Sequence, residues 1–277
     1  MKPLPLFLVL ASLAAPVLAQ TPQCAPPGAG PSSTNWGQDY RERVEEIFNA
    51  AKQAAGVDQP VLLINVNDLQ KKNAGTRQVD GSPISALPKG TQGIQQDAVI
   101  YTFGVFEIAC DEAQLATFML HEMRHLKKVD GKSHFDRVND CRKQMFDKWA
   151  CGTDLTAYPD DKAIVAAFNS AKGKDVQTQC VLPVEKEADA FAFETLPKLP
   201  YKTNAGTDPN RDARAQAFKN AEAWSVAIGD AVSDPGHGCL ADRAQAGADA
   251  SAKEMAAQHQ KEQELRLQSF VPGAFGN

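Results

Sequence analysis

Two histidines and a glutamate share the short segment HEMRH at residues 121–125. On a helix, residues four apart project from the same face, so the imidazoles of His121 and His125 can reach one ion. Imidazole nitrogen is a common zinc ligand, and catalytic zinc sites keep one position for water. Glu122 can take a proton from that water as it attacks a peptide carbonyl. Because a chance match is the competing interpretation, a third protein ligand is needed; the metzincin position for it, six residues after His125, is Gly131.

A later segment, VEKEADAFAFETL at residues 184–196, supplies a candidate for this third ligand. Glu185 and Asp189 are four residues apart and would share one face of a helix, as a gluzincin requires. Glu185 would bind zinc, and Asp189 would accept a hydrogen bond from a ligand histidine and fix its tautomer. Glu187 and Glu194 are alternative ligands, but neither has an acid four residues further on.

The sequence around these motifs predicts an α+β fold that is predominantly helical. Apolar residues recur at helical spacing from Trp36 to Gly56, whereas residues 60–66 and 98–109 are rich in β-branched or aromatic residues and predict short strands. Residues 67–95 are rich in Gly, Asn, Lys and Ser and predict an irregular surface segment. This segment is the best candidate for a lid, and the sequence leaves open whether a loop or the tail covers the cleft. Further helices are expected near residues 134–150, 160–172, 183–197, 209–232 and 240–268.

The helix that carries HEMRH has recognisable ends. Asp111 is followed by Gln114 three residues later, which is typical of a capping box that opens a helix. Lysines 127 and 128 suit the negative end of the helix dipole, and Asp130-Gly131 is expected to stop it.

The first residues predict export. Lys2 precedes an apolar run that is short for a membrane span, and small residues before Gln20 favour cleavage after Ala19. A periplasmic or secreted location is therefore expected. The predicted organisation is a signal peptide (1–19), a flexible leader (20–35), a metallopeptidase domain (36–245) and a polar C-terminal helix and tail (246–277).

An even number of cysteines in an exported chain predicts disulfides. Cys110, Cys180 and Cys239 lie close to the proposed site segments and would brace them, while Cys141 and Cys151 could close a local loop. The net charge of −5 gives no basic footprint for nucleic acid, and no apolar run after the signal peptide predicts a membrane span. The six cysteines are at positions 24, 110, 141, 151, 180 and 239.

The segment VIYTFGVFEIACDEAQLATFMLHEMRH resembles the core of the gluzincin family that includes the HtpX proteases and the CAAX prenyl proteases. In that family a β-hairpin edge leads into G-L-L-E-L and then D-E-x-E-L-A-x-x-L-x-H-E-x-x-H, and EKEADAFA here resembles its E-x-x-A-D segment. Over about residues 40–245, the resemblance implies a zincin-like metallopeptidase fold, one Zn²⁺ per chain on His121, His125 and Glu185, and a peptide or unfolded protein as substrate. The matching positions are Gly104, Phe106, Glu107, Asp111, Glu112, Leu115, Ala116 and Leu120.

A second point of resemblance is the segment DPGHGCLADR, in which His237 and Arg243 are six residues apart. The family often has a His-Pro at this place, and here Gly238 replaces the proline. The resemblance implies that His237 steadies the oxyanion of the tetrahedral intermediate and that Arg243 pairs with a carboxylate of the site. The other two histidines, His134 and His259, are expected to be exposed polar residues.

The sequence therefore predicts an exported zinc-dependent metalloendopeptidase whose sheet edge pairs with an extended substrate strand. Arg124 occupies a position at which the family more often carries a small residue. Together with the polar C-terminal helix, it keeps open an alternative: a zinc-binding chaperone or assembly factor with weak or no proteolysis. A disulfide-rich structural module without metal is the third interpretation. Nothing in the sequence predicts the oligomeric state.

Overall fold

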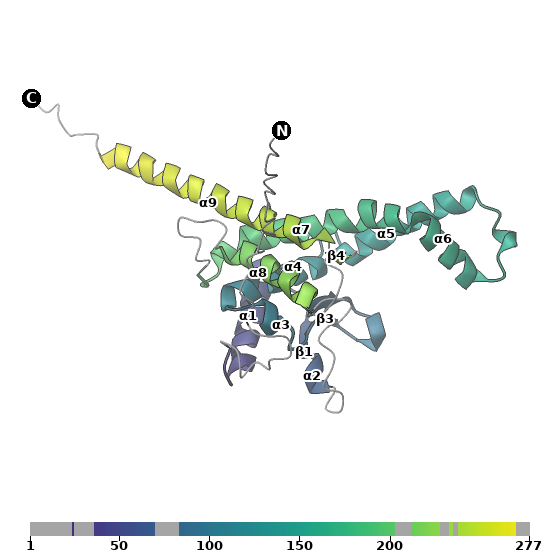
Figure 1. The fold of residues 1–277 in the computed structure, drawn as a ribbon, viewed down its shortest axis with the longest axis horizontal. Helices are drawn as coiled ribbons and strands as arrows, with labels where there is room; N and C mark the ends of the chain where they lie inside the picture. Colours follow the sequence, from purple (N-terminus) through teal and green to yellow (C-terminus); the bar gives the residue numbers. More distant parts are fainter. Residues whose placement is uncertain are drawn as a thin grey trace, which may run out of the picture.

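The computed structural model describes Cys24 and residues 36–69, 83–202, 212–227, 233–234 and 238–269. These residues form a mostly helical protein with a three-stranded sheet at one side of the helices (Figure 1). The main helices are α1 (Tyr40–Ala55), α2 (Val66–Leu69), α3 (Val105–Ile108), α4 (Glu112–Leu126), α5 (His134–Cys151), α6 (Asp161–Val176), α7 (Leu182–Thr195), α8 (Ala213–Ala227) and α9 (Leu240–Ser269). The strands are β1 (Val61–Asn65), β2 (Ile84–Leu87), β3 (Asp97–Tyr101) and the short pair β4 (Ser233–Asp234) and β5 (Gly238–Cys239).

The larger sheet has the strand order β1-β3-β2. β3 pairs in parallel with β1 and antiparallel with β2, so β2 forms one edge. The sequence predicted an irregular segment over residues 67–95. In the described part of this segment the prediction is wrong for Ile84–Leu87, which form the strand β2. Its burial explains the difference, because Ile84, Ala86 and Leu87 are buried and the strand is stabilised by a partner far along the chain rather than by local preference.

The prediction of one or two strands over 98–109 holds only as far as Tyr101. Beyond it the chain turns into the short buried helix α3. Two hydrogen bonds fix the turn: the Phe103 amide donates to Asn67 Oδ1 (2.7 Å), and the Gly104 amide donates to Thr102 Oγ1 (3.2 Å). These contacts override the β preference of the aromatic residues.

α4 is the central helix, and every residue from Ala113 to Leu126 is buried. As predicted, it begins after Asp111, whose side chain accepts a hydrogen bond from the Gln114 amide (2.8 Å). The helix contacts α1, α7, α8 and β2, so its whole circumference faces protein. It ends before the expected stop at residue 130, since residue 127 is already extended.

Two disulfides tie distant segments together. Cys24–Cys110 anchors the leader just before α4, and Cys141–Cys180 joins α5 to the π-helical turn that precedes α7. The suggested Cys141–Cys151 loop is therefore wrong. Both cysteines lie on α5, where ten residues span about 15 Å, too far for a disulfide. Cys151 is an exposed free thiol, and the side chain of Cys239 lies outside the described residues. Disulfides are typical of periplasmic or extracellular proteins.

α5 and α6 form a helical hairpin that extends away from the rest of the protein (Figure 1). Ring contacts among Phe146, Trp149 and Phe168 hold the two helices together. The hairpin lies between α4 and α7 in the sequence. It returns the chain to α4, and α7 packs beside α4.

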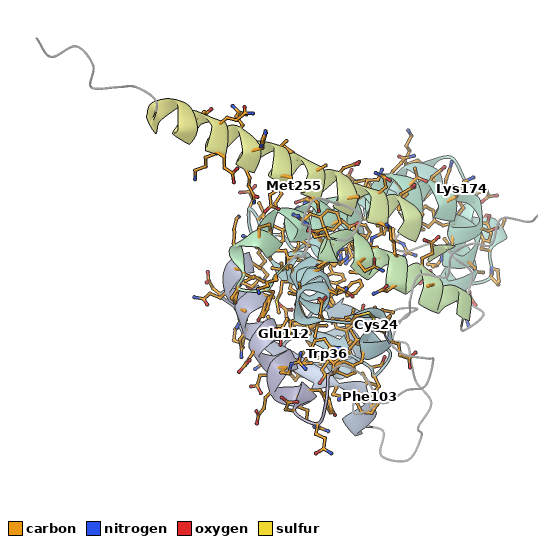
Figure 2. The ribbon with its side chains drawn as sticks, turned by 60° about the vertical axis from the view of Figure 1, so that its left-hand side comes forward. Cys24, Trp36, Phe103, Glu112, Lys174 and Met255 are labelled. Carbon is orange, nitrogen blue, oxygen red and sulfur yellow. A yellow bond between two sulfur atoms is a disulfide. The ribbon has the colours of Figure 1, made fainter. Side chains whose placement is uncertain are left out.

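α9 crosses α8 with its first half and projects beyond the other helices with its second, past Met255 (Figure 2). Small buried residues make the crossing close: Ala244, Ala248 and Ser251 lie at the contact. A Cβ on Gly247 would be 2.9 Å from the Ala215 amide nitrogen. None of the described helices is long and apolar enough to span a membrane.

Candidate metal centre

His121 and His125 lie one turn apart on α4 and direct their Nε2 atoms at the same point. The two Nε2 atoms are 2.9 Å apart, and both side chains are buried. α7 packs against α4 and brings Glu185 to this point, with its carboxylate oxygens 3.2 Å from His121 Nε2 and 3.5 Å from His125 Nε2. The structure thus brings together the three residues that the sequence predicted as ligands.

The spacing of these three donors suits a metal ion. One ligand atom from each residue lies within 4.8 Å of the others. In a tetrahedral site with bonds of about 2.1 Å, ligand atoms are roughly 3.4 Å apart. The observed separations of 2.9, 3.2 and 3.5 Å surround this value. His121, His125 and Glu185 form a buried group that can hold a metal ion.

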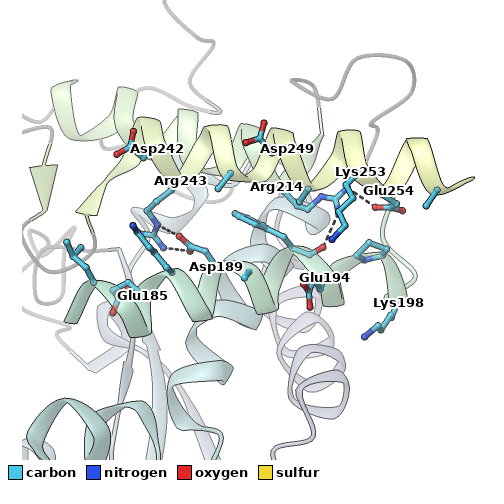
Figure 3. Close-up of a pocket in the computed structure, with 18 residues that line it drawn as sticks. Glu185, Asp189, Glu194, Lys198, Arg214, Asp242, Arg243, Asp249, Lys253 and Glu254 are labelled. Atoms are coloured by element: carbon cyan, nitrogen blue, oxygen red, sulfur yellow. Dashed lines mark hydrogen bonds and ion pairs between the residues drawn. The ribbon is translucent and has the colours of Figure 1, made fainter. Parts of the chain in front are cut away.

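The ring of His121 is oriented on its Nδ1 side by a carboxylate, which is held in turn by a guanidinium. Its Nδ1 lies 2.8 Å from Asp189 Oδ1. Arg243, on α9, donates two hydrogen bonds to the same carboxylate, from Nε (2.8 Å) and Nη2 (2.7 Å), as Figure 3 shows. This bidentate pair joins α9 to α7, and its position behind His121 fixes the direction in which that ring points.

Charges in the metal-free site are strongly coupled. Burial alone would lower the pKa of His121, but hydrogen bonds to Asp189 and Glu185 outweigh burial and raise the pKa to about 9. Burial alone would raise the pKa of Asp189, but the charge of Arg243 and the hydrogen bond to His121 lower it to about 2. Burial likewise opposes ionisation of Glu185, yet its hydrogen bonds to the two ligand histidines hold its pKa well below the usual range. Without a metal, His121 itself therefore carries the positive charge that Glu185 and Asp189 attract, and a bound ion would replace that proton.

His125 has a different partner from His121. Its Nδ1 lies 3.1 Å from Nδ1 of His134, and the two rings are edge to face. The expectation that His134 is an exposed polar residue is wrong, because the side chain is 1% exposed. Burial, the electrostatic effect of the His125 ring and the positive charges of Arg124 and Arg137 lower the pKa of His134 to about 3, so this ring is neutral at pH 7.

Arg124 lies within HEMRH but points away from the proposed ligands. Its guanidinium pairs with Glu187 on α7, and Arg137 on α5 donates a second hydrogen bond to the same carboxylate (2.7 Å). Glu187 is thereby excluded as a substitute for Glu185. Glu194, the other alternative, is exposed on α7.

The side chain of Glu122 points toward the sheet. Its Oε2 accepts a hydrogen bond from the Ala86 amide of β2 (2.6 Å). Residues of an antiparallel strand alternately turn their amide and carbonyl toward the partner and away from it. Since Pro83 O accepts from the Thr102 amide directly after β3, the Ala86 amide faces away from β3. Glu122 therefore lies at the outer side of β2 in the described sheet.

A cavity of about 1120 Å³ lies between α7 and α9 (Figure 3). Glu185, Asp189 and Arg243 line one end, and Lys198 and Glu254 line the other. The cavity thus reaches the buried ligand group from the side of α7 and α9.

Several features of the site had no clear signal in the sequence. The turn that returns His134 to His125 depends on two consecutive positive φ angles, at Asp130 (53°) and Gly131 (78°). The contact of Glu122 with Ala86 depends on an unpredicted strand. His237 lies outside the described residues, so its proposed role has no structural counterpart here.

Comparisons with known proteins add no relative to this picture: no family model, curated protein or solved structure matches the chain. The functional argument therefore depends on the geometry of the site.

Proposed function

We propose that this chain is an exported zinc metalloendopeptidase with a zincin-like arrangement of its site. The observation that supports the proposal best is the combination of three convergent donors with a glutamate that bonds to the outer strand of the described sheet. His121, His125 and Glu185 would hold the ion, and Glu122 lies next to His121 on the same helix. Two histidines with one carboxylate are a known ligand set of catalytic zinc, which keeps its fourth position for water.

Zinc at this site would supply a Lewis acid that polarises a peptide carbonyl and activates a water molecule for attack. Glu122 accepts the proton of the attacking water and later donates it to the leaving amine. Such proton transfer contributes typically 10²- to 10⁴-fold to the rate. The Ala86 amide holds the Glu122 carboxylate in place before the substrate arrives.

The substrate would pair as an extended strand with β2, the outer strand of the described sheet. Backbone hydrogen bonds at a sheet edge hold a peptide without reading much of its sequence. This mode is suited to an unfolded protein, whose backbone is accessible. Developing negative charge on the carbonyl oxygen would be met by His237, while Arg243 acts through Asp189 to hold His121.

The proposal is tested with Glu122→Gln and a matched control, Glu262→Gln, which makes the same change at an exposed position on α9. Both proteins should bind zinc and unfold at the same urea concentration as the wild type. Cleavage of labelled casein should fall at least a hundredfold in Glu122→Gln and stay unchanged in Glu262→Gln.

Undiminished cleavage by Glu122→Gln would overturn the proposal. If no variant cleaves casein but all prevent its aggregation equally well, the chaperone alternative is favoured instead.

A further inference from the structure

The two histidines of HEMRH are supported by different groups. Behind His121 lies the carboxylate of Asp189, at 2.8 Å, whereas behind His125 lies the ring of His134, at 3.1 Å. We propose that His134 is a positioning residue for the metal centre: its Nδ1 accepts the Nδ1 proton of His125 and so leaves His125 Nε2 to bind the ion. This inference rests on the proposed metal site.

The protonation pattern follows from the geometry. His125 Nε2 is the atom that faces His121 and Glu185, so it is the ligand atom. A nitrogen that binds a metal carries no proton, and the proton of the neutral ring is then on Nδ1. Nδ1 of His134, 3.1 Å away, must be the acceptor, which places the proton of His134 on its Nε2.

The surroundings of His134 favour this tautomer. Its Nε2 is buried, has no hydrogen-bond partner among the described residues and lies 3.5 Å from Oε1 of Glu187, so a proton on Nε2 would be close to a carboxylate. That carboxylate is held in turn by ion pairs with Arg124 and Arg137. The cluster therefore presents an acceptor, and not a donor, to His125.

The backbone around His134 is fixed as the role requires. His134 is the first residue of α5, and Ser133 and Asp136 close a capping box around it, with hydrogen bonds of 2.8 and 3.2 Å. The tight turn at residues 129–132 joins this helix start to the end of α4. A ring held by a capped helix can restrict the rotation of His125 more than a surface side chain could.

Two variants whose side chains both branch at Cγ separate the acceptor role from simple packing. His134→Asn places an amide oxygen close to the position of the ring Nδ1, whereas His134→Leu fills the same space without an acceptor. The loss of a group that orients a ligand typically lowers metal affinity by about 10- to 100-fold. Zinc affinity of residues 20–277, measured by competition with a chromophoric chelator, should fall by that factor in His134→Leu. It should stay within about threefold of the wild type in His134→Asn. The Co²⁺ absorption spectrum should change in the leucine variant alone.

The outcomes distinguish this inference from the proposed function. A wild-type chain that binds no zinc would overturn both. Zinc binding that is equally tight in the wild type and both variants would overturn the role of His134 and leave the metal site standing. An equal loss in both variants would overturn the acceptor role.

If the leucine variant does not fold, long-range ¹H–¹⁵N spectra of the zinc-loaded wild type decide the question. The inference requires a bare Nδ1 and a protonated Nε2 on His134. A proton on its Nδ1 would contradict it.

Discussion

The close crossing of α8 and α9 can be tested with one chemical change at two helical glycines. Gly247 lies on α9, one turn after Arg243, and a Cβ there would meet backbone atoms: Ala215 N at 2.9 Å and Arg214 C at 3.0 Å. Gly173 lies inside the helical stretch of α6, and a Cβ there would meet nothing within 4 Å.

The magnitudes follow from these surroundings. Alanine is favoured over glycine in a helix by up to about 1 kcal/mol, so Gly173→Ala should raise the free energy of unfolding by about 0.5–1 kcal/mol. At Gly247 the same gain is opposed by overpacking against backbone, which costs about 1–3 kcal/mol. Gly247→Ala should therefore lower the free energy of unfolding by about 1 kcal/mol in net terms.

Urea unfolding of both variants, followed by circular dichroism, measures the two changes. Because α9 must move away from α8, Gly247→Ala should also shift Arg243 relative to Asp189 and weaken metal binding, whereas Gly173→Ala should not. If both variants stabilise the protein equally, the close approach of α9 to α8 is refuted, and with it the argument for how Arg243 is positioned.

Three further predictions concern the supports of the site. Arg243→Ala leaves the Asp189 carboxylate buried without its main partner and should lower the free energy of unfolding in urea by about 3–5 kcal/mol. The control Arg142→Ala, at an exposed position, should change it by less than about 0.5 kcal/mol. Equally small effects of both variants would contradict the buried ion pair. Replacing both Cys141 and Cys180 by serine opens a loop with a sequence separation of 39 and should lower the free energy of unfolding by about 4 kcal/mol, measured against wild type without reductant; an unchanged midpoint would argue against this pairing. In the metal-free chain the pKa of Asp189 is about 2, below its ordinary 3.8, so the ionised carboxylate stabilises the fold above pH 3.8 by about 2 kcal/mol, and this contribution is lost as the pH falls through 2. Unfolding curves of Asp189→Asn should therefore show a shallower loss of stability over this pH range than the wild type. An equally steep loss would count against the shift.

Local signals predicted the parts of the fold that local physics determines. The start of α4 follows from a capping residue that needs only its own helix, and the common face of His121 and His125 follows from helical geometry. Glu185 was found because the i+4 acid, Asp189, marks one helix face. Each of these inferences uses contacts only a few residues apart.

The remaining features depend on contacts that only the folded chain creates. β2 has four residues and gains its stability from β3, so its own sequence carries little signal. His134 is buried because a turn returns it to His125, and Arg124 is neutralised by Glu187 from a helix more than fifty residues away. One error was avoidable, because the predicted helix over 134–150 already made a Cys141–Cys151 disulfide geometrically unfavourable.

The metal content of the chain tests the central claim most directly. Residues 20–277, purified without added metal, should contain about one zinc per chain by elemental analysis. His121→Ala and Glu185→Ala should each lose the metal while retaining the helical circular dichroism of the wild type. Wild-type protein free of metal, or full zinc retained by both variants, would contradict the assignment of His121, His125 and Glu185 as the site.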